Sequence, residues 1–231
     1  MEHRNGWGLA LLDDIPVSIE KEPVKALDSA KLKKRLETGI WTSGCIAHIR
    51  KATIGEINLH NTHPFSRCDE SGRMWVLAHN GTIFDSVILA PYQYTQEGTT
   101  DSERILLYIV DEMNRFLENN HIPPDADRRI HIIDDVIRSI TPGNKVNLMI
   151  YDGEFFYVHK NEPETLYMKT KDDSVIFSTR PLDMDGWQDV AQNRLLVYKK
   201  GELIYAGPKH YNTYIHDERK MRLLYFDYSG L

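Results

Sequence analysis

The chain has 231 residues, a net charge of −6, and 41% hydrophobic against 27% charged residues. That composition excludes a disordered chain, and the charge, with no Lys/Arg-rich run, argues against a nucleic-acid partner. No apolar stretch is long enough for a membrane partner or a membrane span. We expect one domain over residues 1–231, with its core at about 5–206 and a peripheral tail at about 207–231. Two cysteines, Cys45 and Cys68, do not make a disulfide framework, which favours a cytoplasmic setting.

Short apolar segments alternate with loops in the first third of the chain. We expect strands over residues 7–12, 17–21, 44–50 and 74–79, with a helix near residues 29–36. The first strand begins at once, because residues 5–8, Asn-Gly-Trp-Gly, lead straight into an apolar run. Natural domains usually have some slack before the first core element.

Two adjacent helices are the clearest elements. Thr100 and Glu103 have the spacing of a capping box, and apolar residues follow with helical periodicity. A second amphipathic helix near residues 126–140 ends before Pro142 and Gly143.

The rest of the chain is predicted to form strands. Residues 146–151 and 155–159 flank Asp152-Gly153, a hairpin signal, and further strands are expected at 166–169, 175–178, 195–199 and 203–205. Strands, two adjacent helices and more strands do not make a βαβ order. We therefore predict an α+β fold of two mostly antiparallel sheets with helices packed outside them.

Three polar stretches carry more chemical specificity than a scaffold needs. Arg50 ends a strand and suits capture of a carboxylate, although a solvated strand-end arginine is the simpler alternative. Asn80-Gly81 could be a tight hairpin turn, or it could offer a side-chain amide and a backbone N–H to one oxyanion. Asp101 stands at a helix start, where it could cap the helix or hold a ligand ammonium. Together they describe a pocket for an α-amino acid with a carbonyl farther along its side chain, such as glutamine.

The motifs GWGLA, AHIRKATIG, NTHPF, AHNGTI, TDSE and FSTRPLDMDGW occur in this order between Gly6 and about Tyr205. This combination resembles the class II glutamine amidotransferases of the N-terminal-nucleophile (Ntn) hydrolase superfamily. It is most similar to the small stand-alone branch that includes γ-glutamyl hydrolases. Each motif is weak alone, but the ordered set is specific.

The resemblance implies an αββα sandwich of two stacked antiparallel sheets between helical layers. It also implies that Arg50 binds the substrate α-carboxylate with Thr53 beside it, and that Asp101 holds the α-amino group. Asn80 and Gly81 would form the oxyanion hole. No metal and no cofactor are expected, and the substrate is a small molecule, glutamine or a γ-glutamyl amide.

Two positions depart from the pattern of the larger amidotransferases. Lys51 and Ile54 stand where those enzymes carry tryptophan and histidine. The rim of the pocket is therefore expected to differ in shape from theirs.

The nucleophile implied by the resemblance is a cysteine at the start of the mature chain, with its own α-amino group as base. No such cysteine precedes the Gly-Trp-Gly segment here. Cys45 is expected to pack as a small hydrophobe, and Cys68 lies among carboxylates that raise a thiol pKa. We therefore expect the nucleophile and the first strand to be missing, no hydrolysis by this chain as written, and an open edge on the sheet that carries residues 7–12.

Other functions stay open at this point. A non-catalytic γ-glutamyl-binding protein or regulatory subunit would keep the clamp without the chemistry. A metalloenzyme using His60 and His63, with His48 or His79, lacks a familiar ligand spacing. Ammonia, if formed, would go to an accepting partner or be released by simple hydrolysis. The sequence does not fix whether the chain forms a homo-oligomer.

Overall fold

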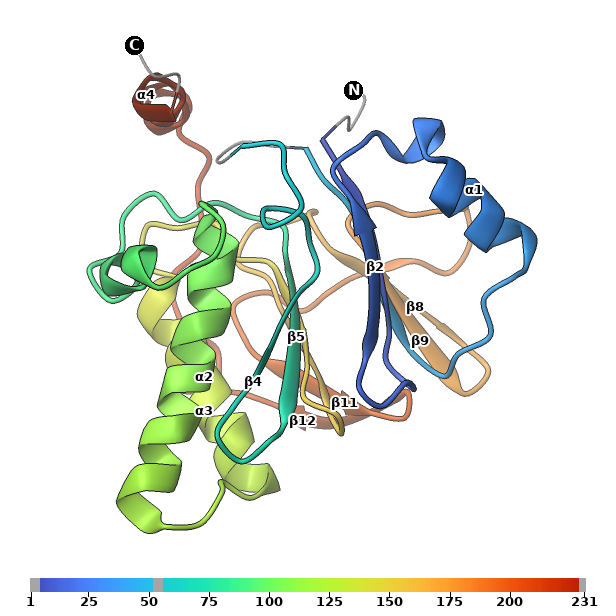
Figure 1. The fold of residues 1–231 in the computed structure, drawn as a ribbon. Coiled ribbons are helices and arrows are strands. Elements are labelled where there is room, and N and C mark those ends of the chain that lie inside the picture. The colour runs from blue at the N-terminus through green and yellow to red at the C-terminus, as the bar shows by residue number, and fades with distance from the viewer. Residues whose placement is uncertain (1–4, 52–55, 229–231) are drawn as a thin grey trace.

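The computed structural model describes residues 5–51 and 56–228 of the chain (Figure 1). The strands are β1 Trp7–Leu11, β2 Ser18–Glu22, β3 Cys45–Ile49, β4 Phe65–Cys68, β5 Met74–His79, β6 Leu148–Tyr151, β7 Phe156–His159, β8 Tyr167–Lys171, β9 Ser174–Ser178, β10 Gln188–Asp189, β11 Leu196–Lys199 and β12 Glu202–Ala206. The helices are α1 Ala30–Glu37, α2 Asp101–Asn120, α3 Ala126–Ile140 and α4 Glu218–Tyr228, with short 3-10 turns at Ala26–Asp28 and Ala90–Tyr94.

The described strands form three antiparallel sheets. A six-stranded sheet has the order β12-β11-β7-β6-β5-β4, and two three-stranded sheets have the orders β2-β1-β3 and β10-β8-β9. The two small sheets pack side by side as one layer against the same face of the large sheet, and α2 with α3 covers its other face (Figure 1). Helix α1 covers the outer face of the β2-β1-β3 sheet. These layers form an αββα sandwich, as the sequence predicts.

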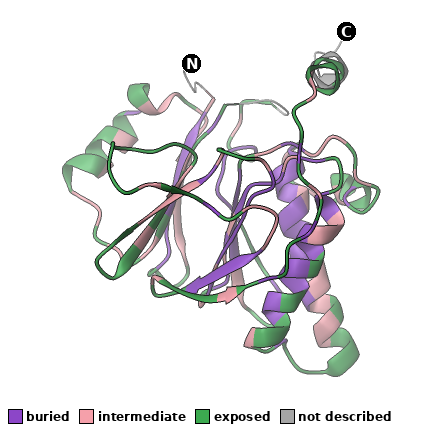
Figure 2. Ribbon diagram, turned by 180° about the vertical axis from the view of Figure 1, so that it is seen from behind, coloured by how far each residue is buried: buried purple, intermediate pink, exposed green. Residues whose placement is uncertain are grey.

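Alternation along β5 shows how the sequence builds these layers. Trp75 and Leu77 pack toward α2 and α3, whereas Val76 and Ala78 pack between the sheets against Ala10 of β1. All four β5 side chains are buried, and the inner faces of α2 and α3 are buried with them (Figure 2). A strand covered on both faces needs apolar residues at every position rather than every second one.

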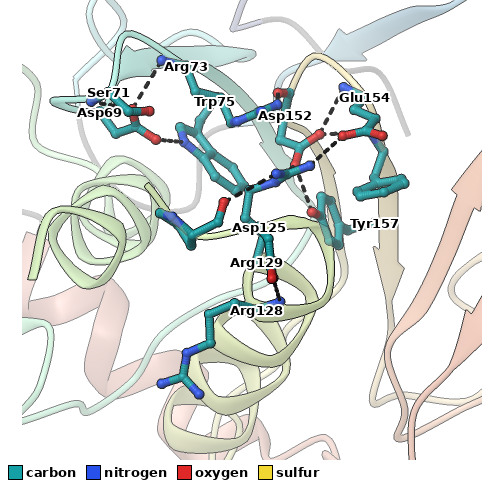
Figure 3. Close-up of polar contacts among 12 residues, drawn as sticks. Asp69, Ser71, Arg73, Trp75, Asp125, Arg128, Arg129, Asp152, Glu154 and Tyr157 are labelled. Carbon is teal, nitrogen blue, oxygen red and sulfur yellow. Dashed lines mark hydrogen bonds and ion pairs between the residues drawn. The ribbon is translucent and has the colours of Figure 1, made fainter. Parts of the chain in front are cut away.

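A buried charge network ties α3 to the turn between β6 and β7 (Figure 3). Arg129 Nε donates to Asp152 Oδ2 at 2.7 Å and Nη2 donates to Glu154 at 2.6 Å, while the Tyr157 hydroxyl donates to Asp152 at 2.8 Å. Asp152 Oδ1 accepts the backbone N–H groups of residues 154 and 155, which shapes the predicted hairpin turn. The sequence signal for this turn was therefore correct, and its aspartate has a second partner on α3.

Three expectations need correction. Strand β4 was not predicted, because three of its four side chains are exposed and no apolar alternation marks it. Cys45 is exposed on edge strand β3 and does not pack as a small core hydrophobe. The segment after β12 is not wholly peripheral, since His210 and Tyr214 are buried against the body, and α4 follows them.

Within the described residues, the edge strands of the sheet that carries β1 are β2 and β3. β1 is the central strand, hydrogen-bonded to β2 and to β3. Edge strand β3 exposes Cys45, Ala47 and Ile49 on one face, and Ile49 is 52% accessible. The open edge expected from a missing first strand stays a prediction.

Candidate active site

Arg50 lies directly after β3 and is buried rather than solvated. Its N–H donates to the Gly6 carbonyl at 2.8 Å, so the β1–β3 pairing continues past the strand end. Arg50 is only 3% accessible to solvent, and its Nη1 donates to the Glu56 carbonyl at 3.0 Å. Burial lowers the pKa of Arg50, and the Asp101 carboxylate opposes that shift. The alternative of a solvated strand-end arginine is therefore wrong, because the Arg50 side chain is buried.

Asn80 and Gly81 do not form a tight hairpin turn. Asn80 N–H donates to the Asn147 carbonyl at 2.9 Å, and Thr82 and Lys145 exchange backbone hydrogen bonds at 2.9 and 3.1 Å. These contacts extend the β5–β6 ladder beyond His79. Because successive N–H groups of a strand alternate in direction, the Gly81 N–H points away from this partner strand. The Gly81 N–H is therefore a donor outside the β5–β6 ladder, and it lies next to the exposed Asn80 side chain.

Gly81 is required here by close packing. A Cβ at this position would lie 2.1 Å from the Lys145 carbonyl oxygen and 2.3 Å from His79 Nε2. Neither the backbone oxygen nor the buried ring can move aside. A glycine lets the chain pass this point, while the close approach of its backbone to a ligand stays a prediction.

Asp101 is the first residue of α2, but Thr100 is the helix cap. Thr100 Oγ1 accepts the Glu103 N–H at 3.3 Å. The Asp101 carboxylate instead reaches across to the chain after Gly81, where Oδ2 accepts the Ile83 N–H at 2.7 Å. Asp101 is buried, so its negative charge lies at the helix N-terminus, beside the Asn80-Gly81 segment.

Asn61 braces the loops that carry these groups, and sequence reasoning did not single it out. Its Oδ1 accepts the Thr99 N–H at 2.6 Å, and its Nδ2 donates to Thr99 Oγ1 at 2.9 Å and to the Glu56 carbonyl at 3.0 Å. The same Glu56 carbonyl receives Arg50. The loop before α2 is thereby tied to the segment that holds the arginine, which brings Arg50 and Asp101 to one place.

Histidines line the same region without forming a metal centre. His63 is buried, both of its ring nitrogens lack a hydrogen-bond partner, and it stacks on His48 at 4.3 Å between ring centroids. Burial, followed by the nearby His48, His79, Arg50 and Lys21, lowers the pKa of His63 well below its usual value. His60 lies apart, exposed beside Glu97. Within residues 5–51 and 56–228, no three His, Cys, Asp or Glu side chains gather as metal ligands.

The remaining sequence candidates lie elsewhere. Thr53 and Ile54 fall outside the described residues. Cys45 and Cys68 are both exposed, on β3 and β4, and partial desolvation raises the pKa of the Cys45 thiol. A raised pKa leaves less thiolate, the reactive form. In the described part of the chain, no helix is long and apolar enough to cross a membrane.

The chain is similar to glutamine amidotransferases in sequence and in fold. The family model for class-II glutamine amidotransferases matches residues 1–170. An uncharacterized protein of Methanocaldococcus jannaschii is 28% identical over 90% of this chain, which spans 64% of that relative's length. The crystal structure of a predicted glutamine amidotransferase from Pseudomonas aeruginosa matches with a TM-score of 0.65 and 24% identity over 88% of both chains. The allosteric regulatory enzyme of purine biosynthesis shares the fold, with a TM-score of 0.64 and 14% identity over 87% of this chain and 42% of that one.

Proposed function

Because this chain belongs to the class-II glutamine amidotransferases, we propose that it binds the γ-glutamyl group of glutamine, or of a related γ-glutamyl amide, at Arg50, Asp101 and the Asn80-Gly81 segment. The observation that carries this proposal is geometric: buried Asp101 accepts the Ile83 N–H at 2.7 Å beside that segment. Buried Arg50 shares the Glu56 carbonyl with Asn61, which in turn accepts the Thr99 N–H just before Asp101. A buried cation and a buried anion at one place suit a ligand that carries both an α-carboxylate and an α-ammonium.

The substrate's side-chain amide would then reach the Asn80-Gly81 segment. The Gly81 N–H, turned away from the partner strand, and the Asn80 amide would donate to the carbonyl oxygen. When a nucleophile attacks the amide carbon, this oxygen becomes negative, and the same two donors stabilise it. The amide nitrogen takes up the proton lost by the nucleophile and leaves as ammonia, with cleavage of the C–N bond. Water then breaks the bond between the acyl carbon and the nucleophile, which releases the γ-carboxylate and regenerates the nucleophile. One such donor contributes about 10²–10³-fold in rate.

The two cysteines are poor sources of that nucleophile. Cys45 is exposed at a sheet edge with a raised thiol pKa, and Cys68 is exposed on β4 with its Sγ 3.9 Å from the Met74 sulfur. We propose that neither attacks the substrate. Cys45→Ser and Cys68→Ser should therefore leave glutamine binding and any ammonia release unchanged.

Calorimetric titration with L-glutamine tests the proposed function. Asp101→Asn keeps the size of the side chain and removes its charge, so glutamine affinity should fall at least about tenfold. Arg50→Lys keeps a charge but loses the planar fork, and should weaken binding by a similar factor. Asp134→Asn is the matched control, because Asp134 is similarly buried on α3 but pairs with Arg138.

The outcomes separate the two candidate functions. Glutamine binding with release of ammonia supports an amidohydrolase. Binding without ammonia release supports the alternative, a non-catalytic γ-glutamyl-binding protein. No binding of glutamine, or equal losses in Asp101→Asn and Asp134→Asn, would contradict the proposed site.

A further inference from the structure

The side chain of His79 joins the two halves of the proposed site. His79 is the last residue of β5 and directly precedes Asn80, and its ring is buried. Its Nδ1 lies 3.0 Å from Ser102 Oγ in the first turn of α2, and its Nε2 lies 3.2 Å from the Lys145 carbonyl oxygen. One ring therefore bridges β5, α2 and the chain that pairs with Gly81.

These partners determine where the His79 ring proton and the Ser102 hydroxyl proton lie. A carbonyl only accepts, so His79 Nε2 must carry the ring proton, and Nδ1 must then accept the Ser102 hydroxyl proton. Burial keeps the pKa of His79 below its usual value, against the opposing effect of Asp101, which fits a neutral ring with one proton.

The same assignment determines what Asp101 receives. Ser102 Oγ also lies 3.3 Å from Asp101 Oδ1. A hydroxyl has a single proton, and the His79 ring takes it. Asp101 Oδ1 therefore receives no proton from Ser102 and can accept a hydrogen bond from another donor, while Asp101 Oδ2 accepts the Ile83 N–H.

The ring also packs against Gly81. A Cβ on Gly81 would lie 2.3 Å from His79 Nε2, so the Gly81 backbone packs directly against the imidazole. We propose that His79 and Ser102 are positioning residues, which set the oxyanion donors of Asn80-Gly81 in register with the Asp101 carboxylate. This inference rests on the proposed function, because it assigns a role within the same site.

Two ligands separate positioning from simple stability. L-Glutamine engages both the Arg50–Asp101 clamp and the Asn80-Gly81 donors, whereas L-norvaline has the same α-groups but no side-chain amide. Ser102→Ala removes the proton that holds the ring, and His79→Gln keeps an amide near the Lys145 carbonyl without the ring. Each should lower L-glutamine affinity about tenfold and leave L-norvaline affinity within about twofold.

Controls complete the calorimetric experiment. Ser102→Thr keeps a hydroxyl and should restore L-glutamine affinity. Ser139→Ala is the matched control, since Ser139 sits on the neighbouring helix α3 and donates only to the Val136 carbonyl. Thermal melts confirm that each variant is folded, and Ser102→Ala remains informative if His79→Gln does not fold.

The results distinguish this inference from the function on which it rests. Wild-type protein that binds neither ligand, or binds both equally, would overturn the proposed function itself. Wild-type protein that prefers L-glutamine, with variants that lose both ligands in parallel or lose neither, would overturn only the positioning role.

Discussion

At the scale of single residues, Gly81 is a tightly constrained position of the proposed site. Both the Lys145 carbonyl and the His79 ring stand where a Cβ would be. Gly81→Ala must therefore push the backbone away from the position from which its N–H would serve the ligand. We expect loss of L-glutamine binding and a lower melting temperature. Gly44→Ala is the control, because its nearest contact is a Leu12 side-chain carbon at an ordinary 3.4 Å. Equal effects of the two substitutions would contradict this account.

A second residue-scale prediction concerns pH. His159 Nδ1 faces the Val146 carbonyl at 2.8 Å, and its Nε2 faces His210 Nε2 at 2.9 Å. Asn212 N–H donates to His210 Nδ1, so the ring proton of His210 lies on Nε2 and faces His159 Nε2. Protonation of His159 would place a second N–H against it, so the folded state favours neutral His159. Burial, followed by the electrostatic effect of His210, lowers the pKa of His159 to about 3.

The sign of the effect follows from linkage. The unfolded chain takes up a proton on this histidine below about pH 6.5, whereas the folded protein does so only near pH 3. Stability is thus fully present above pH 6.5 and falls as the pH drops toward 3. From this group alone, the free energy of unfolding should fall by about 2 kcal/mol between pH 7.5 and pH 5.

Urea unfolding at the two pH values measures this loss. His159→Gln removes the titrating ring and should flatten the dependence, although the other buried histidines still contribute. An unchanged slope in His159→Gln would show that His159 titrates normally in the folded state.

Sequence reasoning marks a residue best where its type is tied to one chemistry. Arg50 and Asp101 were marked by charge at element ends and both are buried, while their roles toward a ligand stay predictions. Asn61 was noted only within the NTHPF motif and His79 only as a metal-ligand candidate, because amides and histidines are common in loops and strand ends. Their importance comes from partners 38 and 23 positions away, Thr99 and Ser102. No local pattern reveals such pairs.

At the scale of elements, a buried charge network away from the proposed site links α3 to the β6–β7 turn. Arg129 and Asp152 are both almost fully buried, with side chains 4% and 0% accessible. Removing the Asp152 charge leaves the buried Arg129 with the partly exposed Glu154 as its ion-pair partner, which does not compensate the buried charge fully. Asp152→Asn should therefore lower the free energy of unfolding by about 3 kcal/mol.

An exposed pair provides the comparison. Arg115 and Glu112 lie one turn apart on the outer side of α2. Glu112→Gln should change stability by less than about 1 kcal/mol in the same urea titration. If the two variants were equally stable, the buried network would not hold α3 against the sheet.

Element prediction worked best where period and caps agree. The α2 start at Thr100 and the α3 end before Pro142 were both visible as local signals. β4 and the two-residue β10 were missed, because a short strand with exposed side chains is defined by its partner's backbone rather than by its own sequence.

At the scale of the whole molecule, the large sheet and the two small sheets should differ in local stability. Strands β5, β6 and β7 are interior strands of the six-stranded sheet, whereas β8 is the only interior strand of the β10-β8-β9 sheet. Native-state hydrogen exchange should therefore be at least about a hundredfold slower in β5–β7 than in β8 and β9. Equal protection would mean that the layers open as a single unit.

The order of the layers was predictable, but their division was not. Strands, two helices and more strands indicated two sheets between helices, which is the arrangement observed. One layer consists of two separate three-stranded sheets, β2-β1-β3 and β10-β8-β9. This division depends on which strands pair with one another over long distances in the sequence. Sequence alternation tells which face of a strand is buried but not which strand lies beside it.

The central claim is that one γ-glutamyl ligand spans Arg50, Asp101 and the Asn80-Gly81 segment. The most direct measurement is a crystal structure of the protein with L-glutamine. We predict the α-carboxylate at the Arg50 guanidinium, the α-ammonium at Asp101 and the amide oxygen facing Asn80 Nδ2 and the Gly81 N–H. Glutamine bound away from these groups, or with its amide directed away from Asn80 and Gly81, would contradict the account.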